Sequence, residues 1–453
     1  MKWMPVAVVA GAALVAFGAA GLFGRAPKPP ADRPPYLAPG LVWTHARTVG
    51  VGGCASAACH GGPATASLAG KLDERTWAGS AMHWMAVDPH TKAYAALQSP
   101  LAADIMKRMR STVGATADAR CLACHTNPSL ANESADAGER SLRAEGVSCE
   151  ACHGDAGKWL HHHTTWTPAN RAAAYEQQGM VKLYDLGERA LACAGCHVGA
   201  PADAARGYPV RDMNHDMIAA GHPRLNFDFA DYQRRLPPHW FEEDQSPDFE
   251  SKAWLVGRVT HQEAAILLHE DREKRAKAND PRTPWPEFAD GKCVSCHHSL
   301  ADNFPAHEAV PGALIWQPVW PLGARGNHGD LANSFELPPS DVPEDSSAVF
   351  QLQRAKRQIL AAPDQKIVDT VDHLIRRVRL NPNNRKVLAD RDRASQIYHA
   401  LAARERSRMN REGRTTYDPS FDRIAKSLTL PRGNLDFSVK PGTIEDLRKL
   451  LNQ

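Results

Sequence analysis

The sequence has little excess charge of either sign and only a modest share of apolar residues. Its 453 residues include 54 Lys and Arg against 51 Asp and Glu, a formal charge of +3. A charge so close to balance gives no indication of a nucleic-acid partner, because such proteins carry a strongly basic surface. Hydrophobic residues make up 43% and the mean hydropathy is −0.43. The composition therefore supplies few aliphatic side chains for a chain of this length.

Cysteine is absent after residue 296, and the 10 cysteines form pairs that are each followed at once by a histidine. Four pairs read Cys-x-x-Cys-His, at residues 121–125, 149–153, 193–197 and 293–297. This is the attachment signature of a c-type haem, since two thiols three positions apart reach the vinyl groups of one porphyrin and the next histidine can bind its iron. Zinc ribbons and thioredoxin-like sites share Cys-x-x-Cys but need no histidine at that place.

The remaining pair, Cys54 and Cys59, has a four-residue spacer and is followed by His60. A disulfide between the two cysteines is the alternative. The haem interpretation is favoured because wider spacers occur in other multihaem cytochromes and because it leaves no cysteine over. We number the sites as motifs 1 to 5 in chain order and predict about five covalently bound haems c. The predicted attachment thiols are Cys54, Cys59, Cys121, Cys124, Cys149, Cys152, Cys193, Cys196, Cys293 and Cys296, and the predicted proximal iron ligands are His60, His125, His153, His197 and His297.

The N-terminal segment predicts export. Residues 1–25 begin with Met1-Lys2 and then run apolar to Gly24, which fits a signal peptide or, because of the length of the run, an uncleaved membrane anchor with a cytoplasmic N-terminus. Residues 26–45 are rich in proline and predict an extended linker. Because haem is attached covalently outside the cytoplasmic membrane, we expect the chain on the periplasmic side of that membrane or free in the periplasm.

The fold class predicted is mainly α with little regular sheet, built around close-packed haems. Residues 46–335 are expected to form a pentahaem domain, and residues 336–453 a helical region without haem. Within the latter, residues 376–414 are rich in arginine. They are interpreted either as a solvated helix face with paired Asp and Glu or as a docking surface for an acidic partner or haem propionates.

Residues 49–325 resemble the cytochrome c554-like multihaem cytochromes. The segments that carry the resemblance surround motifs 1, 3 and 4 and also include Asp88-Pro89-His90, Asn214-His215-Asp216, Gly221-His222-Pro223-Arg224-Leu225 and Cys296-His297-His298. The resemblance implies a mainly helical fold around close-packed haems, some of them stacked in parallel pairs. It also implies distal iron ligands at His90, His215, His222 and a histidine after Trp159. His163 is chosen for that place, with His162 second.

The resemblance supplies four distal ligands for five haems. The fifth could be His83, His298, His307 or a methionine, or the iron could be open. Two further histidines, His261 and His269, lie among Glu and Arg on the helix expected over residues 250–280 and are interpreted as surface or haem-edge residues.

Three functions fit these observations. The first is an electron carrier that passes electrons from a membrane donor to another redox protein, because a haem with two histidine ligands is closed to substrate. The second is a reductase or oxidase of a small nitrogen or sulfur oxyanion at one five-coordinate haem. The third is a scaffold subunit whose C-terminal helices dock partners.

Overall fold

The computed structural model describes residues 47–63, 76–131, 137–167, 169–225, 227–240, 242, 244–290, 293, 296–297, 348–429 and 436–453. The chain divides into two units, Met1–Thr44 and His45–Gln453. The first unit, and with it the predicted anchor and most of the predicted linker, lies outside the described residues. So does the predicted domain boundary between residues 335 and 336. The description below concerns the second unit.

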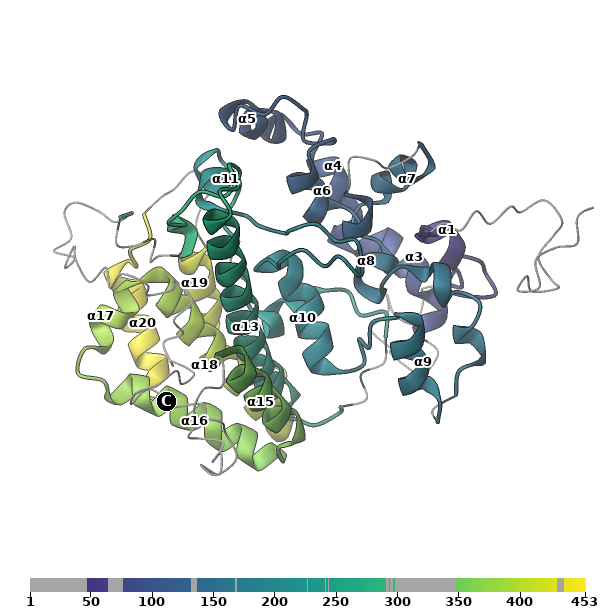
Figure 1. Cartoon of the computed structure of the whole chain (residues 1–453). Helices are drawn as coiled ribbons and strands as arrows, with labels where there is room; N and C mark the ends of the chain where they lie inside the picture. Colours follow the sequence, from purple (N-terminus) through teal and green to yellow (C-terminus); the bar gives the residue numbers. More distant parts are fainter. Residues whose placement is uncertain are drawn as a thin grey trace, which may run out of the picture. The chain divides into compact units, whose positions relative to one another are not determined.

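The described part of this unit is mainly helical, as the sequence predicts. Its only β interactions are isolated bridges, Ala200 with Arg211, Asp203 with Tyr208 and Asp390 with Ser438. None of the described helices has the length and hydropathy needed to cross a membrane. The α-helices of Figure 1 are α1 (Val51–Cys54), α3 (Ser80–Val87), α4 (Ala93–Ala96), α5 (Pro100–Arg108), α6 (Ala119–His125), α7 (Ala137–Leu142), α8 (Cys149–His153), α9 (Arg171–Gln178), α10 (Leu186–His197), α11 (His215–Ala219), α12 (Phe229–Arg235), α13 (Phe249–Lys277), α15 (Ala348–Ala361), α16 (Asp364–Leu380), α17 (Asn384–Ala389), α18 (Arg391–Glu412), α19 (Pro419–Leu428) and α20 (Pro441–Leu451).

Short 3-10 helices connect many of these elements. They are η1 (Thr76–Gly79), η2 (Pro89–Lys92), η3 (Pro128–Leu130), η4 (Arg143–Glu145), η5 (Ala156–Lys158), η6 (His163–Thr165) and η7 (Phe288–Asp290). The described helices before α10 are at most nine residues long. Helices this short are marginal on their own, so packing must hold them in place.

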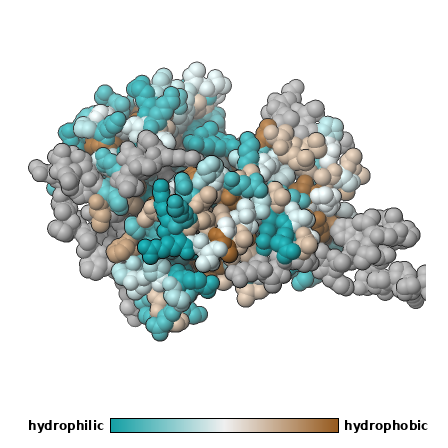
Figure 2. Space-filling model, turned by 90° about the horizontal axis from the view of Figure 1, so that it is seen from above, coloured by the Kyte–Doolittle hydropathy of each residue, from teal (hydrophilic) through white to brown (hydrophobic). Residues whose placement is uncertain are grey.

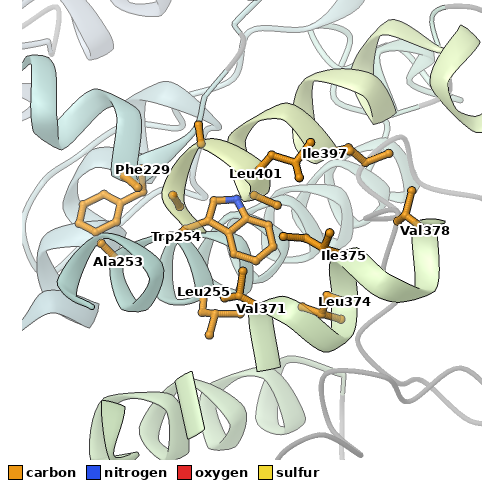
Figure 3. Close-up of a cluster of buried hydrophobic side chains, with 14 of the residues drawn as sticks. Phe229, Ala253, Trp254, Leu255, Val371, Leu374, Ile375, Val378, Ile397 and Leu401 are labelled. Carbon is orange, nitrogen blue, oxygen red and sulfur yellow. The ribbon is translucent and has the colours of Figure 1, made fainter. Parts of the chain in front are cut away.

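Helix α13 is the centre of the main hydrophobic core. Its consecutive residues Ala253, Trp254, Leu255 and Val256 are all buried, so the helix is surrounded on every side. It packs against α10, α12, α15, α16 and α18. Figure 3 shows Trp254 and Leu255 facing apolar side chains from α16 and α18, with Phe229 of α12 next to Ala253.

One glycine sets the distance between α12 and α13. A Cβ atom at Gly257 would lie 2.5 Å from the Cβ atom of Phe229, which is itself fully buried. The two helices therefore approach more closely than any larger residue would permit.

The C-terminal helices α15–α20 belong to the same hydrophobic core as α10, α12 and α13. Ion pairs also join α18 to the start of α13. Arg406 of α18 lies 3.5 Å from Glu250, and Arg411 lies 2.8 Å from Asp248. These arginines of the 376–414 stretch have carboxylate partners within the chain, which favours the interpretation of a paired helix face. His261, on the buried part of α13, is only 2% exposed. Of the two positions expected for His261, the surface is therefore wrong, because residues 253–261 of α13 are all buried; the position at a haem edge stays a prediction.

We expect a large-to-small substitution in this shared core to destabilise the protein. Leu401 of α18 is fully buried, whereas Leu380 at the end of α16 is 69% exposed. Leu401→Ala should lower the free energy of unfolding by about 2–5 kcal/mol. Leu380→Ala is the matched control and should change it by less than about 0.5 kcal/mol. Denaturant unfolding followed by far-ultraviolet circular dichroism measures both, and equal effects would contradict the shared core.

Candidate haem-binding site

Helical turns hold the cysteines of motifs 2 to 5 on one side. Motif 2 ends α6, motif 3 is α8 and motif 4 ends α10, so that the two cysteines of each lie three residues apart on one helix face. In motif 5 the backbone N–H of His297 donates to the carbonyl of Cys293 at 2.7 Å, which is also a helical turn. The spacing read from the sequence therefore appears in the structure as a repeated local geometry.

Aspartate caps fix the start of two of these helices. Asp118 accepts a hydrogen bond from the backbone N–H of Arg120 at 2.9 Å before α6. Asp185 accepts from Gly187 and Glu188 at 2.8 and 3.0 Å before α10. Each cap satisfies backbone donors that the helix leaves free and so determines where the following motif begins.

Motif 1 uses a turn in place of a helix. Cys54 is the last residue of α1, the next four residues form the spacer, and the backbone N–H of His60 returns to the carbonyl of Cys54 at 3.1 Å. A Cβ atom at Gly61 would lie 2.1 Å from the carbonyl oxygen of Ala55, so the turn closes only with glycine there. Cys54 and Cys59 are free thiols, one buried and one exposed. The structure does not join them in the alternative disulfide.

Each predicted proximal histidine lies beside one other histidine. The ring centroids within each pair are 6.2–6.5 Å apart. Two imidazoles that bind one metal atom from opposite sides, each with about 2 Å from nitrogen to metal, have centroids about 6.3 Å apart. The pairs are His60 with His163, His125 with His222, His153 with His239, His197 with His90, and His297 with His215.

The partners of four pairs are the histidines chosen from the sequence as distal ligands. His163 lies opposite His60, with Trp159 5.5 Å and Trp166 6.3 Å from its ring. His162, the second choice, is exposed. The structure thus pairs each of these histidines with a proximal one, a pairing that the sequence did not predict, because the partners lie about a hundred positions apart in the chain.

The partner of the fifth pair, His239, was missed by the sequence analysis. Of the candidates considered for this place, His83 is buried without a ring partner among the described residues, and His298 and His307 lie outside them. A signal was available in Pro237-Pro238-His239-Trp240. His239 follows a proline, as His90 does, and a proline fixes the backbone next to a ligand outside a regular helix.

Backbone carbonyls orient several of the paired rings. The Nδ1 atoms of His60, His125 and His222 lie 2.9, 2.7 and 2.8 Å from the carbonyl oxygens of Trp77, Ala93 and Pro223. A carbonyl oxygen can only accept a hydrogen bond, so Nδ1 carries the proton in each case. The lone pair of Nε2 is then free to bind a metal.

Burial lowers the pKa of five of the ten paired imidazoles, those of His153, His163, His197, His222 and His239. It lowers the pKa of His153 to about 3, assisted by the neighbouring His239, and it lowers the pKa of His197 to about 4, assisted by His90. His90 differs. Burial acts to lower its pKa, but the hydrogen bond and the charge of Asp88 outweigh this and raise it. The neutral imidazole is the form that binds a metal.

A cavity of about 1220 Å³ connects motifs 1 to 4. Its wall includes the proximal and distal histidines of all four sites, and apolar side chains provide most of the remainder. Within the described residues no cluster of three or more His, Cys, Asp or Glu could hold a bare metal ion. Two protein ligands per site is the number required by an iron whose other four positions are taken by a porphyrin, so the residues present fit haem.

The thiols also show which motifs are neighbours. Cys149 of motif 3 raises the pKa of Cys54 of motif 1, and Cys196 of motif 4 raises the pKa of Cys124 of motif 2, so the thiols of these motifs lie close together. The charge of Cys193 acts on Cys152, which places motif 3 beside motif 4. The four sites on the cavity therefore follow the order 1, 3, 4, 2.

A buried glutamate connects motifs 1 and 3. Glu150, the first variable residue of motif 3, is fully buried and accepts hydrogen bonds from the backbone N–H groups of Gly50 at 2.8 Å and Ala156 at 2.6 Å. Burial raises its pKa, while these backbone donors act in the opposite direction. The sequence analysis did not single out Glu150, because its role depends on a contact about a hundred residues away.

The fifth site lies against the C-terminal region. The backbone N–H of Phe437 donates to the carbonyl of His297 at 3.0 Å, and the two rings are 6.1 Å apart. On the opposite side the backbone N–H of His215 donates to Glu287 at 2.9 Å, and the Phe288 ring lies 5.8 Å from the His215 ring. Neither His215 nor His297 lines the cavity of the other four sites.

Exposed apolar side chains beside the paired rings provide a further test of whether these residues fit a haem. Trp77 is 51% exposed next to His60, and Phe288 is 69% exposed next to His215. Figure 2 shows hydrophilic and hydrophobic residues interspersed over one face of the molecule, and single exposed apolar residues need no explanation there. Beside a histidine pair, such side chains provide an apolar wall of the kind that a porphyrin covers.

Comparison with known proteins identifies a family for part of the chain. Residues 75–154 match the family model described as cytochrome c554 and c-prime. The matched segment contains motifs 2 and 3 and the Asp88-Pro89-His90 segment, and covers less than a fifth of the chain. No curated protein and no solved structure matches. The match supports covalently bound haem c and confirms, over residues 75–154, the resemblance to the cytochrome c554-like cytochromes drawn from the motifs.

Proposed function

We propose that the protein is an electron-transfer cytochrome with five haems c, each held by two histidines. The observation that carries the proposal is the set of five imidazole pairs, each with a centroid separation close to that of two ligands on one metal. Each pair contains one histidine that directly follows an attachment cysteine. The distal partners are His163, His222, His239, His90 and His215 for motifs 1 to 5.

His239 favours the carrier over the reductase. A reductase needs one iron with an open position, and the sequence left the distal ligand of one haem unassigned. With His239 opposite His153, each proximal histidine has a partner among the described residues. Iron with two histidine ligands has no position for an oxyanion and exchanges electrons without binding a substrate.

Haem c supplies one-electron oxidation and reduction, and the side chains of this chain hold and shield it. Thiols anchor the porphyrin, Nε2 atoms bind the iron, and Nδ1 bonds to backbone carbonyls fix the rings against rotation. The effect of Cys149 on the pKa of Cys54, and of Cys196 on the pKa of Cys124, supports close packing of neighbouring haems. Closely packed redox centres are what a carrier requires.

We further propose that the protein acts on the periplasmic side of the cytoplasmic membrane. Residues 1–25 support export, either as a signal peptide or as a membrane anchor. The proposed partners are a membrane electron donor and another redox protein, with no role for nucleic acid. The balanced charge of the chain and the internal pairing of arginines such as Arg406 support the last point.

The assignment of His239 predicts a specific spectroscopic change. In the oxidised, purified protein we expect haem analysis to give five haems per chain and electron paramagnetic resonance to give low-spin signals throughout. His239→Ala removes the distal imidazole from one iron and should convert about one haem in five to high spin. The matched control is His83→Ala, which removes a buried histidine without a ring partner among the described residues and should leave every haem low-spin.

Two results would contradict the proposal. High-spin iron in the unaltered protein would mean an open coordination site and would revive the reductase. A high-spin signal in His83→Ala but not in His239→Ala would mean that the distal ligand is misassigned.

The wide spacer of motif 1 predicts a change in mass. Replacing both Cys54 and Cys59 by serine should remove one covalent haem, so that the intact mass corresponds to four haems in place of five. The matched control replaces Cys121 and Cys124 of motif 2 in the same way and should also remove one haem. Mass spectrometry of the purified proteins distinguishes the outcomes. An unchanged haem count after the motif 1 substitution would show that this pair carries no haem.

A further inference from the structure

Asp88 is a buried carboxylate in direct contact with a paired histidine. It is 4% exposed and stands between α3 and η2. One of its oxygens, Oδ1, lies 2.9 Å from the backbone nitrogen of His90 and 2.9 Å from its ring nitrogen Nδ1. The backbone contact caps the short helix, and the ring contact bears on the iron site.

This ring contact differs from those in the neighbouring sites. The Nδ1 groups of His60, His125 and His222 meet neutral backbone carbonyls. His90 meets a carboxylate. A hydrogen bond to an ionised acceptor is stronger than one to a neutral acceptor, and it shifts electron density from the imidazole N–H toward the ring. The unprotonated nitrogen of His90 is therefore the most strongly donating of these four.

The carboxylate has no cation within ion-pair distance among the described residues other than the His90 ring itself. Its charge also reaches the adjacent site, since it acts on His239 and on Cys152 of motif 3. In a buried, low-dielectric setting a charge acts over a longer distance than at the surface. Asp88 therefore adds negative charge between the sites of motifs 3 and 4. It directly contacts only the site of motif 4, through His90.

We propose that Asp88 is a positioning residue that lowers the reduction potential of the haem held by His197 and His90 relative to the sites whose ring N–H groups meet carbonyls. Ferric haem carries one more positive charge than ferrous haem. Both the donating ring and the nearby carboxylate favour the ferric form. The inference rests on the proposed function, because it requires that this pair binds a haem iron.

Asp88→Asn tests the proposal with little change of shape. The amide oxygen of the new side chain can still accept both hydrogen bonds, so the substitution removes the charge and retains the geometry. In a potentiometric titration followed by visible absorbance and electron paramagnetic resonance, we expect the midpoint potential of one haem to rise. A change of about tenfold in the reduction equilibrium constant corresponds to 59 mV for one electron. The other four haems should shift less, that of motif 3 most among them.

Two further variants separate charge from structure. Asp88→Glu retains the charge and should keep the potential of this haem within about threefold of the unaltered equilibrium constant. Asp185→Asn changes the cap of α10, which carries motif 4, but Asp185 bonds only to backbone N–H groups and not to a ring. Asp185→Asn should leave all five potentials unchanged.

Each outcome decides the question. Unchanged potentials in Asp88→Asn, or an equal rise in Asp88→Glu or Asp185→Asn, would overturn the proposal. If high-spin iron shows that the Asp88→Asn substitution has released His90, the Asp88→Glu variant decides, since a retained potential supports the role of charge and a tenfold rise contradicts it. Failure of the proposed function would appear separately, as fewer than five low-spin haems in the unaltered protein.

Discussion

The separation between paired imidazoles is the constraint on which the rest of the haem region depends. Rings with centroids more than 6 Å apart are too distant to hydrogen-bond to each other, and all ten are partly shielded from water. Burying ring nitrogens without partners destabilises a fold, and burial has already lowered the pKa of His153 to about 3, so that protonation offers no relief. A metal atom between the two rings of a pair would accept the lone pairs of both rings at once. The short helices of this region are therefore expected to depend on cofactor attachment for their stability.

The remaining described part of the chain is stabilised in a different way. Around α13 the core is filled by aliphatic and aromatic side chains, and the C-terminal helices provide much of it. The apolar side chains of the sequence are thus unevenly distributed, because motifs 1 to 4 surround a cavity while the C-terminal helices pack conventionally. The fifth histidine pair contacts both parts of the chain. The backbone of Phe437 bonds to His297, and Glu287 bonds to the backbone of His215, so the C-terminal region, which has no cysteine, contributes to this pair.

The sequence predicted whatever depended on local spacing. Cys-x-x-Cys-His places two thiols and a proximal ligand next to one another, and the mainly helical class was predicted from apolar periodicity and from the family resemblance. The distal histidines were found through a family resemblance, and His239 was missed because no spacing relates it to Cys149, about ninety residues earlier. The packing of α13 against α15 and α18 could not be predicted from local sequence patterns either, because it joins segments far apart in the chain. The surface was a wrong expectation for His261 because the charged residues next to it, Arg258 and Glu263, are themselves buried.

Two buried carboxylates near the cavity show why contact with a ring matters more than the presence of a charge. Glu150 lies in motif 3 itself, but its oxygens accept only backbone N–H groups, among them those of Gly50 and Ala156, which fix motif 1 against motif 3. Those donors disperse its charge, and burial raises its pKa. Asp88 has the same chemistry in a different position, with one oxygen on the His90 ring. Glu150 therefore serves the architecture of two sites, and Asp88 the electronic properties of one.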